Sequence, residues 1–238
     1  MALTDFHSHI LPGIDDGSPS AEVSVAMLQA AAEQGVRHVV ATPHFYAQHH
    51  KPEKFLAKRA ESEQLLRQEL VKHPELPRVS VGAEVLYFSG IADSPILSQL
   101  TIAGTNYILI ELPMPPWSDR VYKDLENIWR KQDLIPVIAH IDRYLSLWNT
   151  GSILRRLSEL PVLVQANAEF FLRRSTRRLA FRMLEQGRIH LLGSDCHNMT
   201  DRKPNMGEAI ALLQKKFGTG ILDHIRYFER EIFPNDYE

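Results

Sequence analysis

Histidine and carboxylate side chains stand at the ends of short apolar segments along the 238-residue chain. The first such segment ends in Asp-Phe-His-Ser-His at positions 5–9. The alternation of side chains along a strand places His7 and His9 on one side, where two imidazoles can share a cation. A lone His-x-His remains a weak signal, because histidine also serves in many packed and surface roles.

Potential ligands recur where the later apolar segments end. They are His44 after Ala-Thr-Pro, Glu84 after Gly-Ala, Glu111 in Ile-Glu-Leu-Pro, His140 after Ala, and Asp195 with His197 in Gly-Ser-Asp-Cys-His. Asp15-Asp16-Gly17 adds a further carboxylate, and Asn167 is suited to orienting a ligand or substrate. Each residue has a bland alternative as a helix cap, a turn residue or an ion-pair partner. Their joint occurrence at strand ends predicts a metal site.

The mixture of nitrogen and oxygen ligands indicates which cations would bind. It suits Mn²⁺, Zn²⁺ or Fe rather than Ca²⁺, which prefers oxygen alone. Neutral histidines contribute no charge as ligands, whereas the four carboxylates of Asp16, Glu84, Glu111 and Asp195 contribute −4. Two divalent cations would just be neutralised, and three would leave a positive charge for a bridging hydroxide and an anionic substrate.

The elements that must position these residues alternate in type along the chain. Apolar runs rich in β-branched residues alternate with stretches of helical periodicity, which favours a parallel sheet with crossover helices. Seven strands are expected, at Leu3–His7, Arg37–Thr42, Arg78–Glu84, Tyr107–Glu111, Ile135–His140, Val162–Asn167 and His190–Asp195. In a barrel of such strands the carboxyl ends face one mouth, where catalytic groups collect.

Helix signals fill the intervals between the strands. Ser18 is suited to cap the first helix, with Pro19 in its first turn and Gly35 at its end. Further helices are expected near 53–72, 119–132, 151–159, 175–187 and 206–217, and an amphipathic helix is expected within 220–238. No internal repeat or flexible linker divides the chain, so residues 1–238 are interpreted as a single domain.

Composition narrows the class of protein further. A net charge of −2 gives no electrostatic reason to expect a nucleic-acid binder. The single cysteine, Cys196, rules out an intramolecular disulfide and suits a reducing compartment. The N-terminus lacks the features of a signal peptide, and no apolar run approaches the roughly 18 residues of a membrane span. A cytoplasmic location is therefore expected.

The motifs together resemble a known superfamily. Asp-Phe-His-Ser-His-Ile-Leu-Pro-Gly-Ile-Asp-Asp-Gly, Ala-Thr-Pro-His, Gly-Ala-Glu-Val, His-Ile-Asp-Arg-Tyr and Gly-Ser-Asp-Cys-His-Asn are similar to motifs of the polymerase and histidinol phosphatase (PHP) superfamily. Within it, the chain most resembles the bacterial manganese-dependent protein tyrosine phosphatases of capsule and exopolysaccharide biosynthesis. The resemblance spans essentially the whole chain and implies an α/β fold, a distorted (β/α)7 TIM-like barrel.

The resemblance also implies roles for individual residues. The metal-ligand positions of the family are matched by His7, His9, Asp16, His44, Glu84, Glu111, His140, Asp195 and His197. Arg143 and Arg202 match arginines that bind the phosphate. The implied cofactor is Mn²⁺ in a trinuclear site, with Fe, Zn²⁺ or Mg²⁺ as alternatives. The implied substrate is phosphotyrosine on the tyrosine-rich tail of a cytoplasmic autokinase that controls polysaccharide export.

The mechanism expected from these residues is direct hydrolysis. A metal-bridging hydroxide would attack phosphorus in line with the leaving phenolate, while Arg143 and Arg202 offset charge on the phosphoryl oxygens. His44 or His197 would protonate the leaving group. A rival mechanism is visible in Cys196 and Arg202, whose Cys-x5-Arg spacing is that of cysteine-dependent tyrosine phosphatases. The intervening residues contain no glycine and include an acid, which disfavours a phosphate-cradling loop.

Three other functions stay open at the level of sequence. A small phosphomonoester such as histidinol phosphate is the alternative substrate. A metal-dependent amidohydrolase also begins with His-x-His, but it usually has a lysine at strand four and histidines at strands five and six. This chain has Glu111, His140 and Asn167 there. A non-catalytic metal-binding module is disfavoured because the ligand set and both arginines are complete.

Two further groups of residues are relevant to the substrate. Aromatic side chains after strand ends are suited to flank an aromatic leaving group, or to pack in the core: Phe45, Tyr46, Tyr87, Phe88, Trp117, Tyr144 and Trp148. The dense basic run at 173–178 is either a solvated helix entrance or a surface for an acidic phosphopeptide or anionic lipid. Histidines outside the strand-end pattern are expected to be structural: His38, His49, His50, His73, His190 and His224.

Overall fold

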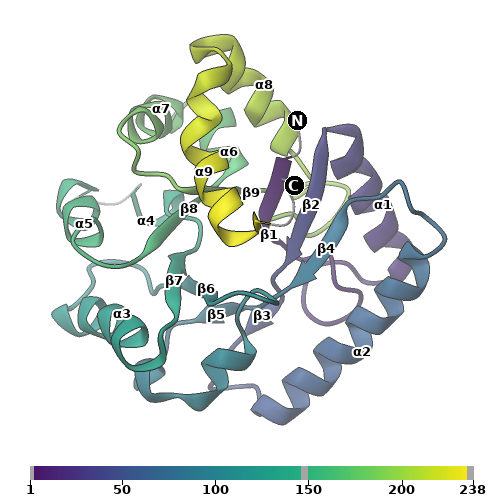
Figure 1. Cartoon of the computed structure of the whole chain (residues 1–238), viewed down its shortest axis with the longest axis horizontal. Helices are drawn as coiled ribbons and strands as arrows, with labels where there is room; N and C mark the ends of the chain where they lie inside the picture. Colours follow the sequence, from purple (N-terminus) through teal and green to yellow (C-terminus); the bar gives the residue numbers. More distant parts are fainter. Residues whose placement is uncertain (1–2, 146–149, 235–238) are drawn as a thin grey trace.

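The computed structural model describes residues 3–145 and 150–234, and this part of the chain forms a curled parallel sheet surrounded by helices (Figure 1). Nine strand segments lie within it: β1 Leu3–Ser8, β2 Val36–Ala41, β3 His44–Phe45, β4 Arg78–Val81, β5 Glu84–Leu86, β6 Tyr107–Glu111, β7 Ile135–Ile138, β8 Leu163–Asn167 and β9 Leu191–Gly193. Every paired segment runs parallel to its neighbour. The predicted α/β architecture is confirmed.

The strands form two sheets, in the orders β1-β2-β4 and β3-β5-β6-β7-β8-β9. Hydrogen bonds between the first and last strands bring the two ends of the sheet together. The backbone N–H of His9 donates to the Cys196 carbonyl at 2.9 Å, and that of Asp195 donates to the His7 carbonyl at 2.8 Å. This contact places the ends of β1 and β9 side by side, as a barrel requires.

One of the seven expected strands is divided, and another is followed by a separate short segment, which is why the structure has nine segments. The expected strand Arg78–Glu84 breaks into β4 and β5 at Gly82, where an added Cβ would lie 3.3 Å from the Ile102 Cα. The path of β2 resumes as β3 after Pro43, which has no N–H to donate to a sheet ladder. Both breaks lie just before predicted site residues, His44 and Glu84, and the segments before and after them belong to different sheets.

Helices cover the outside of the sheet (Figure 1). The predicted ones are confirmed as α1 Ala21–Glu33, α2 Pro52–Leu70, α3 Asp119–Gln132, α5 Thr150–Leu157, α7 Arg177–Glu185, α8 Met206–Phe217 and α9 Asp223–Ile232. The first begins two residues later than expected, because the Ser20 hydroxyl, not that of Ser18, accepts from the Val23 N–H. Short segments that were not expected are α4 Asp142–Leu145, α6 Ala168–Leu172, and the 3-10 turns η1 Ile91–Asp93 and η2 Pro95–Gln99. The 3-10 turn η3 Thr219–Leu222 overlaps the start of the expected C-terminal helix.

Along the later strands, one face changes from apolar to polar toward the carboxyl end. Residues two apart on a strand share a face, so Leu109 shares one with Glu111 and Leu163 with Gln165, while Leu191 lies in β9 ahead of Asp195. The three leucines belong to one buried hydrophobic cluster, which also contains Phe6 and Phe233. Those two rings stack at 5.7 Å, so the C-terminal segment closes the apolar end of the interior and leaves the polar end for the site.

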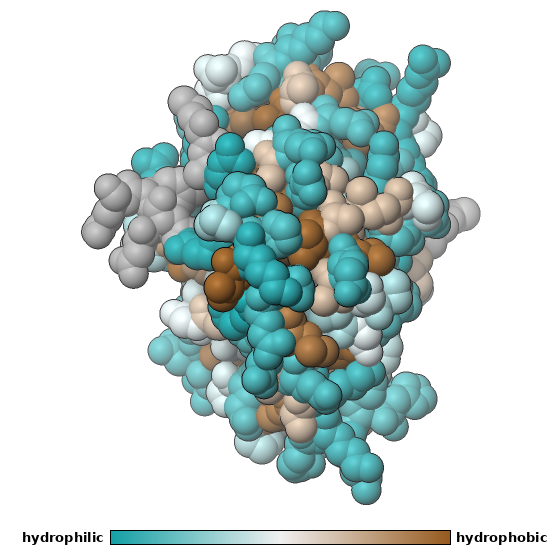
Figure 2. Space-filling model, turned by 90° about the vertical axis from the view of Figure 1, so that its right-hand side faces the viewer, coloured by the Kyte–Doolittle hydropathy of each residue, from teal (hydrophilic) through white to brown (hydrophobic). Residues whose placement is uncertain are grey.

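The surface seen from the side of α1 and α2 is mainly hydrophilic, with hydrophobic residues in separate small areas (Figure 2). Within the described ranges, no helix combines the length and the apolar character needed to cross a bilayer.

Gly193 is expected to be required for the packing of β9 against β1. A Cβ at this position would lie 2.6 Å from the His7 Cβ and 2.8 Å from the Gln165 Nε2. We predict that Gly193→Ala lowers the free energy of unfolding by about 1–3 kcal/mol, measured by urea denaturation. Gly151→Ala is the control, because nothing lies within 4 Å of its added Cβ. Equal stability of the two variants would contradict the close packing described here.

Candidate active site

Glu84 lies at the centre of the strand-end cluster. Its side chain is 1% exposed, and its Oε2 lies 3.2 Å from the His7 Nε2 and 3.3 Å from the His9 Nε2. The same oxygen lies 3.0 Å from the His44 Nδ1, while Oε1 lies 2.7 Å from the His140 Nε2. The structure thus brings four of the predicted histidines around one buried carboxylate.

Asp195 forms the second centre and connects the histidines to the two arginines. Its Oδ1 lies 3.5 Å from the Nε2 atoms of both His7 and His9. Arg202 Nη2 donates to the same oxygen at 2.9 Å, and Arg143 Nη2 donates to Oδ2 at 2.6 Å. Both predicted phosphate-binding residues therefore lie directly beside the predicted metal ligands.

The remaining predicted ligands lie at the edge of this cluster. Asp16 is 65% exposed, and its Oδ1 lies 3.4 Å from the His44 Nε2 and 3.6 Å from the His197 Nε2. Glu111 Oε1 lies 3.5 Å from the His140 Nε2. Three sets have ligand atoms within 4.8 Å of one another: His9, Asp16, His44 and His197; His7, His9 and Asp195; and His44, Glu84 and Glu111.

The donor set fits divalent cations, because several of its buried polar atoms have no hydrogen-bond partner. The clearest cases are His140 Nδ1 and His197 Nε2, whereas Glu84 Oε2 and His44 Nδ1 lack a hydrogen bond of accepted geometry although they lie 3.0 Å apart as an ion pair. Buried polar atoms in proteins are almost always paired, so unpaired ones need an explanation. Imidazole nitrogens and carboxylate oxygens are the ligands that Mn²⁺, Zn²⁺ and Fe accept. Cations among these side chains would satisfy the unpaired atoms and offset the cost of burying the carboxylates.

The carboxylates of the cluster raise the pKa of two of its histidines. Burial alone would lower the pKa of His9, but hydrogen bonds with Asp15 and Glu84 raise it to about 10. For His140, hydrogen bonds with Glu111 and Glu84 likewise outweigh burial and raise the pKa to about 9. Protons therefore compensate the carboxylates in the protein alone, and a bound cation would replace those protons.

Asp15 orients one of the histidines rather than joining the cluster itself. Its Oδ2 accepts from His9 Nδ1 at 2.8 Å and from the His44 backbone N–H at 3.1 Å, and its Oδ1 accepts from the Gly17 N–H at 3.0 Å. The His9 proton is thereby held on Nδ1, which leaves Nε2 directed at Glu84 and Asp195. The sequence indicates a carboxylate at this Asp-Asp pair but not the division of roles between Asp15 and Asp16.

A buried chain of amides connects the histidines to Asp195. Gln165 Oε1 accepts from the His140 backbone N–H at 2.6 Å and lies 3.3 Å from the His7 Nδ1. Gln165 Nε2 donates to Asn167 Oδ1 at 3.0 Å, and Asn167 Nδ2 donates to Asp195 Oδ2 at 3.1 Å. Asn167 thus contacts a ligand residue, as expected. Gln165 was missed, although a glutamine inside an apolar strand is a usable signal.

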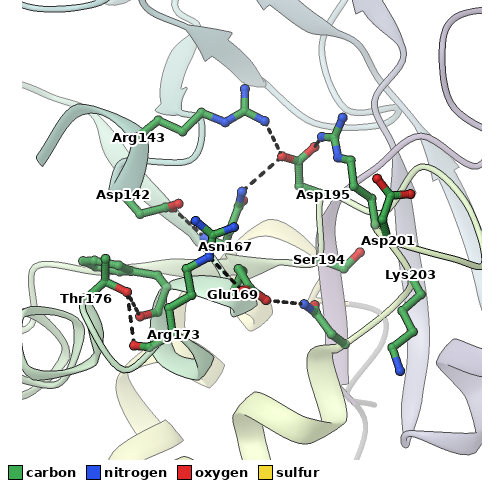
Figure 3. A pocket seen from close by; sticks show the side chains of 13 residues that line it. Asp142, Arg143, Asn167, Glu169, Arg173, Thr176, Ser194, Asp195, Asp201 and Lys203 are labelled. Atoms are coloured by element: carbon green, nitrogen blue, oxygen red, sulfur yellow. Dashed lines mark hydrogen bonds and ion pairs between the residues drawn. The ribbon is translucent and has the colours of Figure 1, made fainter. Parts of the chain in front are cut away.

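A pocket of about 400 Å³ opens beside Asp195, and its wall is strongly charged (Figure 3). Arg143 and Arg202 donate to different oxygens of Asp195. Arg173 and Lys203 lie farther along the wall with Glu169 and Asp201. The pocket is large enough for a phosphoryl group with part of its substituent. Arg143 and Arg202 give its wall positive charge beside Asp195.

The aromatic residues proposed to flank a substrate have different positions. Phe45, Trp117 and Tyr144 are buried, and the Tyr144 hydroxyl accepts from the Leu112 N–H at 2.8 Å, so they pack in the core. Tyr46 is half-buried, and its ring stacks on His44 at 5.1 Å between centroids. Tyr87 donates to Asp124 at 2.6 Å, away from the site. Trp148 lies outside the described residues.

The fold and the site together define a class: an α/β barrel-like protein with histidine and carboxylate clusters at the carboxyl ends of its strands. Residues 3–231 match the family described as Capsular polysaccharide synthesis, CpsB/CapC. The chain belongs to this family, which confirms the resemblance seen in its motifs.

Curated relatives and solved structures agree with this assignment. The tyrosine-protein phosphatase CpsB of Streptococcus pneumoniae is 31% identical over 231 residues, covering 91% of each chain. The tyrosine-protein phosphatase YwqE of Bacillus subtilis is 30% identical, covering 91% of this chain and 86% of its own. A crystal structure from work on these two proteins, described as unique metal-dependent tyrosine phosphatases, superposes with a TM-score of 0.84 at 28% identity, covering 96% of this chain and 93% of its own. The phosphotriesterase homology protein of Escherichia coli shares the fold, with a TM-score of 0.53 at 13% identity, covering 98% of each chain.

The rival cysteine mechanism is tested by Cys196→Ser. The thiol is 2% exposed, and burial raises its pKa far above the usual range, which opposes formation of the nucleophilic thiolate. We predict that the variant hydrolyses p-nitrophenyl phosphate within about tenfold of the parent rate, as expected for a small change of buried packing. Loss of nearly all turnover in a protein with unchanged thermal stability and metal content would favour the thiolate instead.

Proposed function

We propose that this chain is a metal-dependent protein tyrosine phosphatase that acts on phosphotyrosine in a protein controlling capsule or exopolysaccharide synthesis. The observation that carries the proposal is the pairing of a buried histidine and carboxylate cluster with two arginines on one wall of a pocket. The tyrosine phosphatase names of relatives about 30% identical over most of the chain support it. Residues 1–238 act as one domain in this proposal.

The residues that would hold the metal are His7, His9, Asp16, His44, Glu84, Glu111, His140, Asp195 and His197. Three sets of ligand atoms within reach of one another support a site for three cations, and the mixed donors support Mn²⁺ among the candidates. Bound there, divalent cations make water available as a nucleophile near neutral pH and stabilise charge on a phosphoryl group.

The two arginines position the phosphate. Burial would lower the pKa of Arg143, but Asp195, Glu84 and Glu111 raise it, so its guanidinium stays charged. A planar guanidinium can meet two phosphoryl oxygens at once, which a lysine cannot do. Arg143 donates to Asp195 Oδ2, and Arg202 donates to Asp195 Oδ1. A phosphoryl group in the pocket would therefore lie near two positive charges that Asp195 holds in place.

Protonation of the leaving phenolate is proposed for His44, with His197 as the alternative. Burial and the neighbouring His9 lower the pKa of His197 to about 4, which favours the neutral imidazole and a ligand role. His44 is 13% exposed and stacks on Tyr46 at the rim. A substrate ring packed beside Tyr46 would place its oxygen near His44, which supports an aryl phosphate as the substrate.

The proposed function is tested by comparing substrates on one metal-quantified sample. We expect kcat/KM to be highest for a phosphotyrosine peptide, lower for a phosphoserine peptide and lowest for histidinol phosphate. Exhaustive chelation should abolish turnover, and added Mn²⁺ should restore it. Without cations, the ligand residues can neither activate water nor offset the negative charge of the phosphoryl group. Preference for histidinol phosphate would support the alternative substrate, and undiminished turnover after chelation would contradict the metal-dependent mechanism.

Arg143→Lys separates bidentate phosphate binding from simple positive charge. We predict a fall in kcat/KM for p-nitrophenyl phosphate of roughly 10²-fold, since one preorganised charged donor pair is lost. Bound metal should stay unchanged by elemental analysis. Arg120→Lys is the matched control, because this exposed arginine pairs with Asp124 and Ser89 away from the site. Equal activity of the two variants would remove Arg143 from the proposed role.

A further inference from the structure

A second, strongly basic groove lies between α7 and the end of α8. It has a volume of about 670 Å³ and is lined by Arg174, Arg177, Arg178, Phe181, Arg182, Glu185, Lys216 and Phe217. The rings of Phe181 and Phe217 meet edge to face at 5.1 Å and line it with aromatic surface. Five of its eight lining residues are cationic and one is acidic, so the groove is complementary to a negatively charged ligand.

Three of these arginines have no structural partner in the described part of the chain. The side chains of Arg174, Arg178 and Arg182 are exposed, and their guanidinium groups form no hydrogen bond or ion pair with the residues of that part. Their neighbours differ: Arg173 donates to Glu169 at 2.8 Å, and Arg177 donates to the Phe171 carbonyl at 2.8 Å. The fold therefore uses Arg173 and Arg177 and leaves the other three charges available for a ligand.

The cluster of arginines is unfavourable for the stability of α7, the helix on which it lies. Arg177 and Arg178 occupy the first turn of α7, where the helix dipole favours negative charge, and no acidic residue stands there. Arg178 and Arg182 are four residues apart, a spacing at which like charges repel. The Thr176 hydroxyl does not cap the helix, because it donates to the Phe170 carbonyl at 2.8 Å. An anionic ligand would offset each of these unfavourable terms.

The groove and the catalytic pocket share the segment 173–177 of their walls. Arg173 and Thr176 line the pocket (Figure 3), whereas Arg174 and Arg177 line the groove. The contacts of Thr176 and Arg177 with α6 hold this segment in place as a shared wall. A peptide that crosses this wall from the pocket would reach the arginines of the groove.

We infer that the groove binds an acidic segment of the phosphoprotein whose phosphotyrosine occupies the pocket. This inference rests on the proposed function. A peptide is favoured over a lipid surface because the binding face is a concave groove with an aromatic lining and adjoins the catalytic pocket. Glutamate or aspartate residues on one side of the phosphotyrosine would meet Arg174, Arg178, Arg182 and Lys216. The groove would lower KM for such substrates and leave the chemistry at the cluster unaltered.

The test compares Arg178→Gln/Arg182→Gln with the control Lys54→Gln/Lys123→Gln, which removes two exposed, unpaired lysines elsewhere in the described structure. Substrates are phosphotyrosine peptides with a glutamate block before or after the tyrosine, matched glutamine peptides, and p-nitrophenyl phosphate. We expect the groove variant to raise KM roughly tenfold for one glutamate peptide alone. Its kcat and its turnover of p-nitrophenyl phosphate should match the control.

Three results would overturn the inference. The first is an equal loss of activity on the glutamate and glutamine peptides, and the second is an equal effect in the control variant. The third is unchanged peptide kinetics together with lost binding to phosphatidylglycerol vesicles, which would assign the groove to a membrane surface. Anisotropy of a labelled glutamate peptide without phosphotyrosine tests the groove separately. If the parent hydrolyses no phosphotyrosine peptide but binds this probe through Arg178 and Arg182, the proposed function fails and the acidic-peptide site stands.

Discussion

The buried carboxylate of Glu84 is the constraint around which the rest of the site is arranged. A negative charge with 1% exposure is costly unless several partners compensate it. The ends of β1, β3 and β7 supply those partners, since His7, His9, His44 and His140 all lie within 3.3 Å of its oxygens. Because these histidines come from separate strands, the site exists only when the sheet curls, and the fold and the chemistry depend on the same contacts.

Local backbone geometry produces this convergence. His140 and Asp195 follow β7 and β9 with positive φ angles of 32° and 54°, which turn their side chains from the strand direction into the cluster. Such conformations are unfavourable for residues with a side chain and persist only where the surroundings hold them. Gln165 holds His140 through its backbone N–H, and the His7 carbonyl holds Asp195 in the same way. The strain lies where the site needs precise orientation.

Features with a local, repeated signal were predictable from the sequence, and features set by tertiary contact were not. Apolar periodicity marked α3 and α8 with their observed bounds, and the recurrence of ligand residues after apolar runs marked the cluster. The break at Gly82 depends on the approach of Ile102, which no local pattern reveals. Gln165 acquires its importance from partners 25 and 158 residues away, so its position alone could only suggest a buried polar group.

The two arginines and the histidine and carboxylate cluster share one carboxylate, that of Asp195, so their charges must be considered together. Arg143 and Arg202 each donate a hydrogen bond to Asp195, so the carboxylate that would bind metal also holds the two proposed phosphate-binding residues in place. Within the described structure the carboxylates are compensated by these guanidinium groups and by protons on His9 and His140. Cations would replace the protons but not the arginines. The positive charge facing the pocket would then exceed what the carboxylates neutralise, and an entering phosphoryl group would restore the balance.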